Sequence, residues 1–449
     1  MRHESLWRNK TVEQSGLVVQ LLAQPAVNLA LVHNSVPLVS SLRVTNSSGR
    51  PAVDTTVTVR LFGNGEELAP TWTRTYEGEL PDGGDAYWDD FSDLVPAISY
   101  LRALNESHPA TIAVTVSTMW AADVNLTMPI QVLAHNEWFN GPICYDSLTA
   151  FVQPNTSAVQ SVLSDAAELL RTNTGSSSLE GYQSGPERAA LIATAIYESL
   201  RSRGIRYIDP PASFEETGQK VRTTAQVLDQ SFGTCIDLAV TYAACLEAAG
   251  LRPLLWLVTG HAFTGFLTED ASLPLPTILE PNALINLVES GKAIAVEAVY
   301  YNQTDAGDFK GAMRRAREHF ASPDTLCGVV DVVAARKSGI RPLLSGNDVV
   351  PTAQPRQADL HDVVLALPDE LKARGNTDDV VLDTTDHAPA RVRKWTRALL
   401  DLSTRNRLLN LKPSAQVIDL HVPQDGLPLL DDIIHSGDSI TLTPNDDLA

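Results

Sequence analysis

Apolar and polar residues alternate along much of the first 140 positions, as they do in β-strands that have one face in water. The alternation is clearest between Val57 and Leu61, where every second side chain is apolar. Turn-forming residues fill positions 46–51 and 81–85, between such runs. Several short strands at this spacing predict an antiparallel sandwich, and we expect an all-β, immunoglobulin-like module over residues 1–140. Its strands are expected at residues 17–22, 38–44, 53–62, 111–118 and 124–132.

The hydrophobic pattern changes to a helical period in the next part of the chain. One helix is expected to begin at Cys235 and to stop at Gly250, and others are expected at 157–170, 187–200 and 308–320. Prolines and polar residues over 268–281 indicate a loop. Strands are expected at 254–258, 262–267 and 292–301, with a last one formed by 329–334 and 340–344. Residues 141–345 are therefore expected to form an α+β domain.

Composition shifts again beyond residue 345. Prolines and polar residues over 346–390 are typical of a linker. We expect a short helical tail over 391–449. A basic cluster at its start could meet a nucleic acid or an acidic partner, but a solvated helix face explains it equally well. The cluster comprises Arg391, Arg393, Lys394, Arg397, Arg405 and Arg407.

Length and charge narrow the class of protein. The 449 residues are too many for one ordinary core, and 44% hydrophobic and 20% charged residues are typical of packed globular domains. A formal charge of −20 argues against nonspecific binding of nucleic acid by the whole chain, so nucleic acid is expected to be only an indirect partner. The N-terminus lacks an apolar signal core, and no apolar run is long enough to cross a bilayer, which favours a cytoplasmic protein without a membrane partner.

The four cysteines are Cys144, Cys235, Cys245 and Cys327, and no two of them form a CxxC pair. This spacing favours reduced thiols over a disulfide framework or a zinc site. We expect no structural metal and no cofactor.

The most informative stretch, residues 231–267, contains a thiol and an imidazole in a suggestive order. Cys235 follows a Gly-Thr step at the expected start of a helix, where free N–H groups and the helix dipole favour an anion such as a thiolate. His261 follows the Thr-Gly step after the strand at 254–258 and is the natural base. Taken singly, such residues are more often core groups, as expected of Cys245 in the middle of the same helix. Their combination favours a catalytic pair.

A cysteine–histidine pair also needs an acid to orient the imidazole. Glu297 is our choice, because it is the only charge in its expected strand after Lys292, and a buried carboxylate requires a partner. The alternative is an edge strand that points Glu297 into water. Asp270 and Glu280, in the loop before that strand, are weaker rivals.

Acyl transfer further requires donors for an oxyanion. The backbone N–H of Cys235 is one candidate, and the side chain of Gln230, five residues upstream, is another. Gln219 and Gln226 compete with Gln230, and a solvent-facing glutamine is the ordinary expectation.

The Gly-Thr-Cys-Ile-Asp-Leu-Ala block at 233–239, the Leu-Glu-Ala-Ala-Gly-Leu block at 246–251 and the Gly-His-Ala-Phe-Thr-Gly block at 260–265 resemble the transglutaminase-like branch of the papain-fold cysteine peptidases. The resemblance covers roughly 157–344. It implies a nucleophile helix packed on an antiparallel sheet that carries the base and the acid.

The segment at 392–410 resembles the opening of a domain of unknown function that precedes superfamily-I helicase-like modules in large bacterial proteins, including presumed antiviral defence factors. No GxxxxGK[ST] phosphate loop occurs in the chain. The resemblance implies a helicase-like partner protein or domain.

Together these patterns predict a thiol protease, a hydrolase in which Cys235, His261 and Glu297 cleave a protein substrate. The same triad also fits a protein-glutamine transglutaminase or deamidase. A reduced context without a calcium-loop pattern favours the peptidase. The alternative from another class is a catalytically silent scaffold that binds a helicase.

Overall fold

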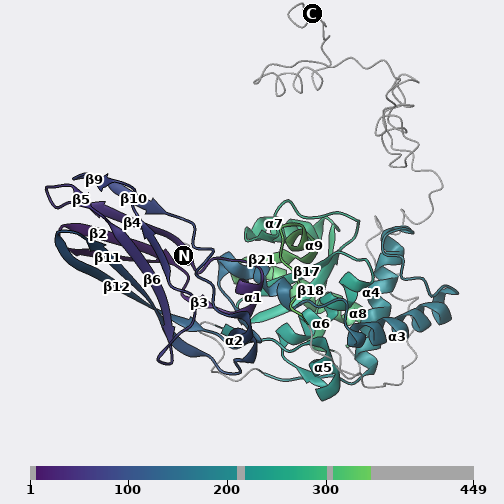
Figure 1. Ribbon diagram of the computed structural model, residues 1–449. Helices are drawn as coiled ribbons and strands as arrows, with labels where there is room; N and C mark the ends of the chain where they lie inside the picture. Colours follow the sequence, from purple (N-terminus) through teal and green to yellow (C-terminus); the bar gives the residue numbers. More distant parts are fainter. Residues whose placement is uncertain (1–6, 210–217, 301–306, 345–449) are drawn as a thin grey trace, which may run out of the picture. The chain divides into compact units, whose positions relative to one another are not determined.

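A computed structural model describes residues 7–209, 218–300 and 307–344. The expected linker at 346–390, the helical tail at 391–449 and the basic cluster of that tail lie outside the described residues. The described chain is a mixed α/β protein whose N-terminal region is rich in strands (Figure 1).

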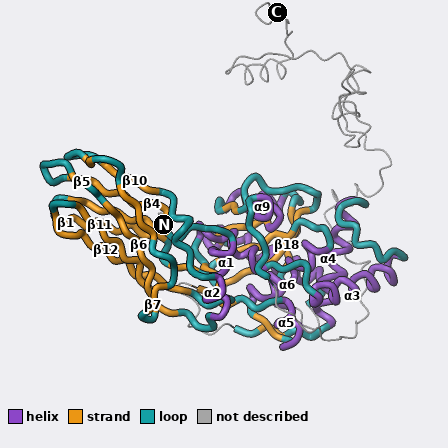
Figure 2. The backbone as a smooth tube through the Cα atoms, viewed as in Figure 1, coloured by secondary structure: helices purple, strands orange, loops and turns teal. Residues whose placement is uncertain are grey.

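The N-terminal region consists mainly of strands (Figure 2). It contains two larger sheets, and all but one of their strand pairs are antiparallel. One sheet has the order β1 (Arg8–Gln14), β2 (Leu17–Ala23), β4 (Val39–Asn46) and β10 (Asp85–Trp88). The other has the order β3 (Ala26–Val27), β12 (Ala121–Val132), β11 (His108–Thr118), β6 (Thr56–Gly63) and β7 (Glu66–Glu67), and β8 (Trp72–Thr75) also pairs with β6. Smaller elements are β5 (Ala52–Val53), β9 (Glu79–Leu80) and α2 (Ile98–Ala103).

Each of the five strands expected in this region overlaps an observed one. Alternation explains this result, since β6 buries Val57, Val59 and Leu61 while the side chains between them are less buried. The missed strand β1 has no such alternation, because it consists mostly of polar residues at the sheet edge. A short helix, α1 (Leu29–His33), was also not expected.

The second region combines helices with a five-stranded antiparallel sheet. The strand order is β19 (Thr277–Ile278), β21 (Leu326–Asp331), β17 (Pro253–Val258), β18 (His261–Leu267) and β20 (Ala293–Val296). The helices are α3 (Ser157–Thr174), α4 (Gly185–Ser202), α5 (Thr224–Gln230), α6 (Cys235–Ala248), α7 (Pro281–Glu289), α8 (Phe309–Glu318) and α9 (Val332–Lys337). The second region also contains 3-10 helices at Pro142–Phe151, Ala298–Tyr300, His319–Ala321 and Pro323–Thr325. Its short strands are β13 (Glu137–Phe139), β14 (Arg206–Tyr207), β15 (Gly218–Lys220) and β16 (Phe232–Gly233).

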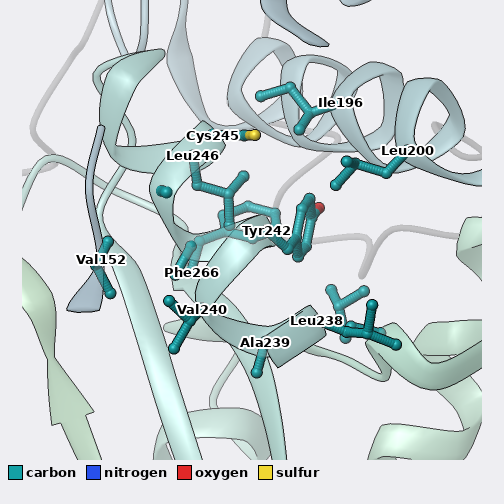
Figure 3. Packing of buried hydrophobic residues seen from close by; sticks show 14 of the residues in the cluster. Val152, Ile196, Leu200, Leu238, Ala239, Val240, Tyr242, Cys245, Leu246 and Phe266 are labelled. Atoms are coloured by element: carbon teal, nitrogen blue, oxygen red, sulfur yellow. The ribbon is translucent and has the colours of Figure 1, made fainter. Parts of the chain in front are cut away.

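Helix α6 is the centre of this second core. It is apolar around most of its circumference, and such a helix must be buried on all sides. Figure 3 shows Tyr242 and Leu246 of α6 beside Ile196 and Leu200 of α4, with Phe266 of β18 close by. Packing between α4 and the sheet therefore fixes the helix that begins at Cys235.

Strand β18 requires a glycine at position 265. A side-chain β-carbon at Gly265 would lie 2.4 Å from the carbonyl oxygen of Ile294 and 2.7 Å from the indole nitrogen of Trp256. Gly265 thus allows β18 and β20 to approach closely.

Three expectations about this region were wrong in detail. β21 ends at Asp331, and a helix follows instead of more strand, because the Asp331 carboxylate accepts from the N–H of Ala334 and caps α9. The expected loop at 268–281 contains β19, and Glu280 caps α7 in the same way. β20 ends at Val296, so Glu297 lies just beyond the strand.

Among the described residues, no helix has the length and apolar character needed to cross a bilayer.

Candidate active site

Cys235 is the first residue of α6, as the sequence predicted. The preceding helix, α5, ends at Gln230, and Ser231 after it has the left-handed conformation (φ 55°), which turns the chain toward the new helix. Thr234 is extended and forms the N-cap, and its N–H donates to the Asp237 carboxylate at 2.9 Å. The Cys235 side chain is therefore held at a helix N-terminus, where backbone N–H groups and the helix dipole favour negative charge.

The buried carboxylate of Asp237 holds the start of α6 in place through hydrogen bonds. It is 0% exposed and accepts from the backbone N–H of Arg222 at 2.7 Å and from the Arg222 guanidinium at 2.8 Å. Arg222 follows β15, which pairs with β13, so that Gln219 is opposite Trp138. The Asp237 contacts thus join the nucleophile helix to the segment that carries Gln219.

His261 is the first residue of β18, opposite Val258 in the β17–β18 hairpin. Gly260, with φ 74°, supplies the left-handed position of that tight turn. The His261 Nε2 lies 2.8 Å from Glu297 Oε2. Since Nε2 is engaged by the carboxylate, Nδ1 is the nitrogen available to the Cys235 thiol, which lines the same cavity as His261.

The surroundings of His261 favour its protonated form. Burial works against a charged ring, but hydrogen bonds and the negative charges of Cys235 and Glu297 outweigh it and raise the pKa of His261 to about 10. An imidazolium between a thiolate and a carboxylate is the ion-pair arrangement that activates a thiol at neutral pH.

Glu297 is 1% exposed, so the alternative that it points into water from an edge strand was wrong. Its Oε1 accepts the N–H of Val299 at 3.3 Å, and its Oε2 accepts from His261 and from His319, the latter at 3.0 Å. Burial alone would raise the pKa of the Glu297 carboxyl, but the hydrogen bonds from the two imidazoles leave it below its usual value.

The rival acids have other partners. Asp270 has a mostly exposed side chain that accepts from the Arg252 guanidinium at 2.7 Å. Glu280 accepts from the N–H of Ala283 at 2.7 Å as the cap of α7. Neither carboxylate contacts His261, so Glu297 is the acid at the imidazole.

Of the three glutamines considered as oxyanion donors, only Gln219 lines the cavity that contains Cys235 and His261. Gln230 has an exposed side chain at the end of α5, and Gln226 closes the capping box of α5 with Thr223. Gln230 is therefore not where an oxyanion donor is needed, and Gln219 is the better candidate. Distance along the chain favoured Gln230, whereas the pairing of β15 with β13 brings Gln219 to the cavity.

The cavity has a volume of about 410 Å³. It is lined by Cys235, His261 and Gln219 together with residues of both polarities, a combination typical of ligand sites. Its other lining residues are Trp138, Asn140, Tyr145, Ile236, Leu257, Val258, Thr259, Gly260, Ala262 and Cys327.

The remaining cysteines differ from Cys235 in their surroundings. Cys245 and Cys144 are buried, and burial raises the pKa of each thiol to about 12. These thiols are expected to be inert. Cys327 is partly exposed and lines the cavity, where its Sγ lies 3.7 Å from the carbonyl oxygen of Thr325. All four cysteines are free.

His319 belongs to the site but was not found from the sequence. It follows α8, and its ring stacks on Phe263 with centroids 4.8 Å apart and planes inclined by 17°. The only signal in the sequence was an aromatic pair, His319 and Phe320, at the end of a strongly amphipathic helix.

His261, Glu297 and His319 each offer a ligand atom, and these atoms lie within 4.8 Å of one another. The set has the chemistry of a divalent-metal site. Both ring nitrogens, however, lie at hydrogen-bonding distance from one carboxylate oxygen, 2.8 and 3.0 Å, which is the geometry of two N–H donors on a shared acceptor.

No family model matches this chain, and no curated protein does. Among solved structures, a protein of Arabidopsis thaliana determined in solution is similar at 10% identity, over 30% of this chain and 86% of that chain, with a TM-score of 0.18. The collagen-binding subdomain of Enterococcus faecalis surface protein ACE is similar at 7% identity, over 30% and 99%, with a TM-score of 0.08. A family 76 glycoside hydrolase from a bovine Bacteroides thetaiotaomicron strain is similar at 10% identity, over 56% and 57%, with a TM-score of 0.13. These scores are too low to support a statement of fold or function.

Fold and site thus define a mixed α/β protein with a β-rich N-terminal region and a partly buried cysteine–histidine–glutamate cluster at the edge of a cavity.

Proposed function

We propose that this protein is a cysteine peptidase that works by thioester acyl transfer. The observation that carries the proposal is that Cys235, at the N-terminus of α6, lines one cavity with His261, whose ring is hydrogen-bonded to Glu297. A structural cysteine needs no base, and a structural histidine needs no buried carboxylate on the nitrogen that faces away from a thiol. This order of groups is what activation of a nucleophile requires.

In the first half-reaction, the Cys235 sulfur attacks the carbonyl carbon of a peptide bond while its proton resides on His261. The negative charge of Glu297 stabilises the imidazolium and holds Nδ1 toward the thiol. The tetrahedral intermediate collapses when His261 returns the proton to the leaving amine. The products of this step are the free amine and a thioester at Cys235.

The second half-reaction resolves the thioester. His261 takes a proton from a water molecule, which attacks the thioester carbonyl, and the carboxylic acid leaves as the proton returns to the sulfur. In both steps the Cys235 N–H and the Gln219 side chain are the candidate donors to the oxyanion. Attack by an amine instead of water would give transglutaminase chemistry with the same residues.

The resemblance to transglutaminase-like peptidases supports this assignment independently of the geometry, because it rests on the blocks around Cys235 and His261. The expected immunoglobulin-like and papain-like folds belong to the same proposal. So do a protein substrate, a helicase-like partner and a role in antiviral defence, which rest on the resemblance of residues 392–410.

The test is incubation of the full chain with candidate partner proteins, followed by mass spectrometry, with Cys235→Ala as the matched inactive control. A new terminus that depends on Cys235 supports the peptidase. An amine adduct instead assigns a transglutaminase, and a Gln-to-Glu mass change assigns a deamidase.

Thiol labelling tests the scaffold alternative. Rapid and selective alkylation of Cys235 over Cys144, Cys245 and Cys327 supports an enzyme. Equal and slow labelling of all four thiols would contradict catalysis by Cys235 and support a binding role.

A further inference from the structure

His319 places a second imidazole on the acid of the triad. Its Nε2 lies 3.0 Å from Glu297 Oε2, the same oxygen that His261 Nε2 reaches at 2.8 Å. The other carboxylate oxygen accepts a backbone N–H, that of Val299, at 3.3 Å. Both carboxylate oxygens are therefore hydrogen-bonded, and the rings of His261 and His319 both donate to Oε2.

The His319 ring is held in place by packing. It stacks on Phe263 of β18 with a centroid distance of 4.8 Å, and it lies 5.2 Å from the His261 ring. Its side chain is 30% exposed, which is less than expected of a free surface histidine at a helix end. The neighbouring Phe320 packs edge-on against Phe263 and Trp256, so the turn after α8 is anchored in the core of the sheet.

We propose that His319 is a positioning residue for the acyl-transfer reaction, in which its Nε2–H holds the Glu297 carboxylate in the orientation and charge state that His261 requires. The inference rests on the proposed function. It adds a fourth residue to the Cys–His–Glu triad and gives the turn after α8 a role in catalysis.

The physical reason is the burial of Glu297. A carboxylate removed from water needs donors to remain charged, and each donor that is lost favours its protonated form. A protonated Glu297 would no longer stabilise the imidazolium. The second donor therefore widens the acidic range over which the triad stays charged.

Two tyrosines also lie near enough to Glu297 to be influenced by its charge. Burial raises the pKa of Tyr197 of α4 and of Tyr207 of β14, and the charge of Glu297 raises both further. The Tyr197 hydroxyl group donates one hydrogen bond to the carbonyl oxygen of Gly307. Cys235 is on the far side of the His261 ring and is itself an anion when activated. Among the described residues, His319 is thus the side-chain donor that reaches Glu297 from outside the triad.

The experiment measures the rate of iodoacetamide labelling of Cys235 across pH in the full chain. His319→Phe retains an aromatic ring against Phe263 but removes the donor. His319→Gln removes the ring but retains an N–H donor near the position of Nε2. Arg314→Ala, an exposed position on the same helix, is the matched control.

In His319→Phe, we expect the acidic limb of the labelling profile to move to higher pH, with labelling about tenfold slower near pH 5 and nearly unchanged near pH 8. His319→Gln should lie much closer to the wild type, because the donor matters and the ring does not. A purely structural role would lower the melting temperature of both variants without moving this limb. If His319→Phe does not fold, His319→Leu takes its place as the variant without a donor.

An unchanged profile in the variants without a donor would overturn the inference. His261→Ala in the same assay keeps the two hypotheses apart. If His261→Ala is also labelled at the wild-type rate, the proposed function fails. If His261→Ala is labelled more slowly while the His319 variants are not, the proposed function stands and the role of His319 is wrong. A wild-type rate that changes on treatment with EDTA, or on addition of Zn²⁺, in a manner that depends on His319 would assign the three residues to a metal and likewise overturn it.

Discussion

A charged carboxylate that is 1% exposed owes its state to its neighbours, and within the described ranges Glu297 accepts from two imidazoles and one backbone N–H. Against the effect of burial, interactions with Cys235 and Glu297 raise the pKa of His261, and interactions with His261 and His319 lower the pKa of Glu297. At the residue scale, the site is therefore a set of coupled charges in which changing one group changes the protonation of the others.

The first prediction at this scale concerns the base. In His261→Ala, labelling of Cys235 at neutral pH should fall by about tenfold or more, because no group remains to take the thiol proton. At high pH the rate should partly recover as the thiol ionises unaided. Rates from mass spectrometry at several pH values, with His135→Ala as the matched histidine control, decide it. A full neutral-pH rate in His261→Ala would remove His261 from the mechanism.

Glu297→Gln should keep the fold but reduce turnover by roughly ten-thousandfold, since an amide fails to hold the tautomer and charge of the imidazole. Its pH profile should also change. Because Glu297 raises the pKa of His261, its loss lowers that pKa, and the alkaline limb of activity moves to lower pH.

The controls for Glu297→Gln are Asp270→Asn and Glu280→Gln, which alter carboxylates that do not contact His261. Turnover and a melting curve are measured for all three variants. Normal turnover in Glu297→Gln with collapse in either control would transfer the role of the acid to the loop.

At the scale of elements, the start of α6 depends on one buried carboxylate. Asp237 holds the N–H of Thr234 and both the backbone and the guanidinium of Arg222. It thereby ties the nucleophile helix to the segment after β15, on which Gln219 is placed.

We predict that Asp237→Ala lowers the free energy of unfolding by about 3 kcal/mol, because it leaves a partly buried guanidinium and two N–H groups without their acceptor. Glu168→Ala, which removes the exposed pair with Arg171, should cost no more than about 0.5 kcal/mol. Urea unfolding of both variants gives the comparison. Equal small losses would show that Asp237 does not hold the helix start.

At the scale of the described chain, α1 connects the cores of the two regions. Leu29 and Val32 pack in the N-terminal core, whereas Ala30 packs in the core around α6. Asn28 caps α1 and donates to the carbonyl oxygen of Glu137 at 2.7 Å, where the chain enters the second region. A substitution that destabilises α1 should therefore destabilise both cores.

The corresponding prediction is that Asn28→Ala destabilises the second region by about 2 kcal/mol, although the residue belongs to the first. The readout is the urea concentration at which Cys245, buried in α6, becomes accessible to a thiol reagent. Asn105→Ala, at an exposed position, should leave that concentration unchanged. If the two cores unfold independently, Asn28→Ala will leave that urea concentration unchanged as well.

The local elements were largely determined by the sequence itself. Hydrophobic period, helix caps and turn residues act over a few positions, so the strands β2, β4, β6, β11 and β12, the helix at Cys235 and the strand at His261 followed from local chemistry. The burial of Glu297 and its contact with His261 could also be expected, because a lone charge in an apolar run already indicates a buried group that needs a partner.

Only the tertiary structure decided which distant residues complete the site. His319 is 58 positions from His261 in the chain, and it meets Glu297 because α8 packs beside β20. Gln219 reaches the cavity because β15 pairs with β13, whereas Gln230, closer in sequence to Cys235, points into solvent. Pairing and packing between remote segments depend on the fit of whole surfaces, and no pattern within a single segment encodes that fit.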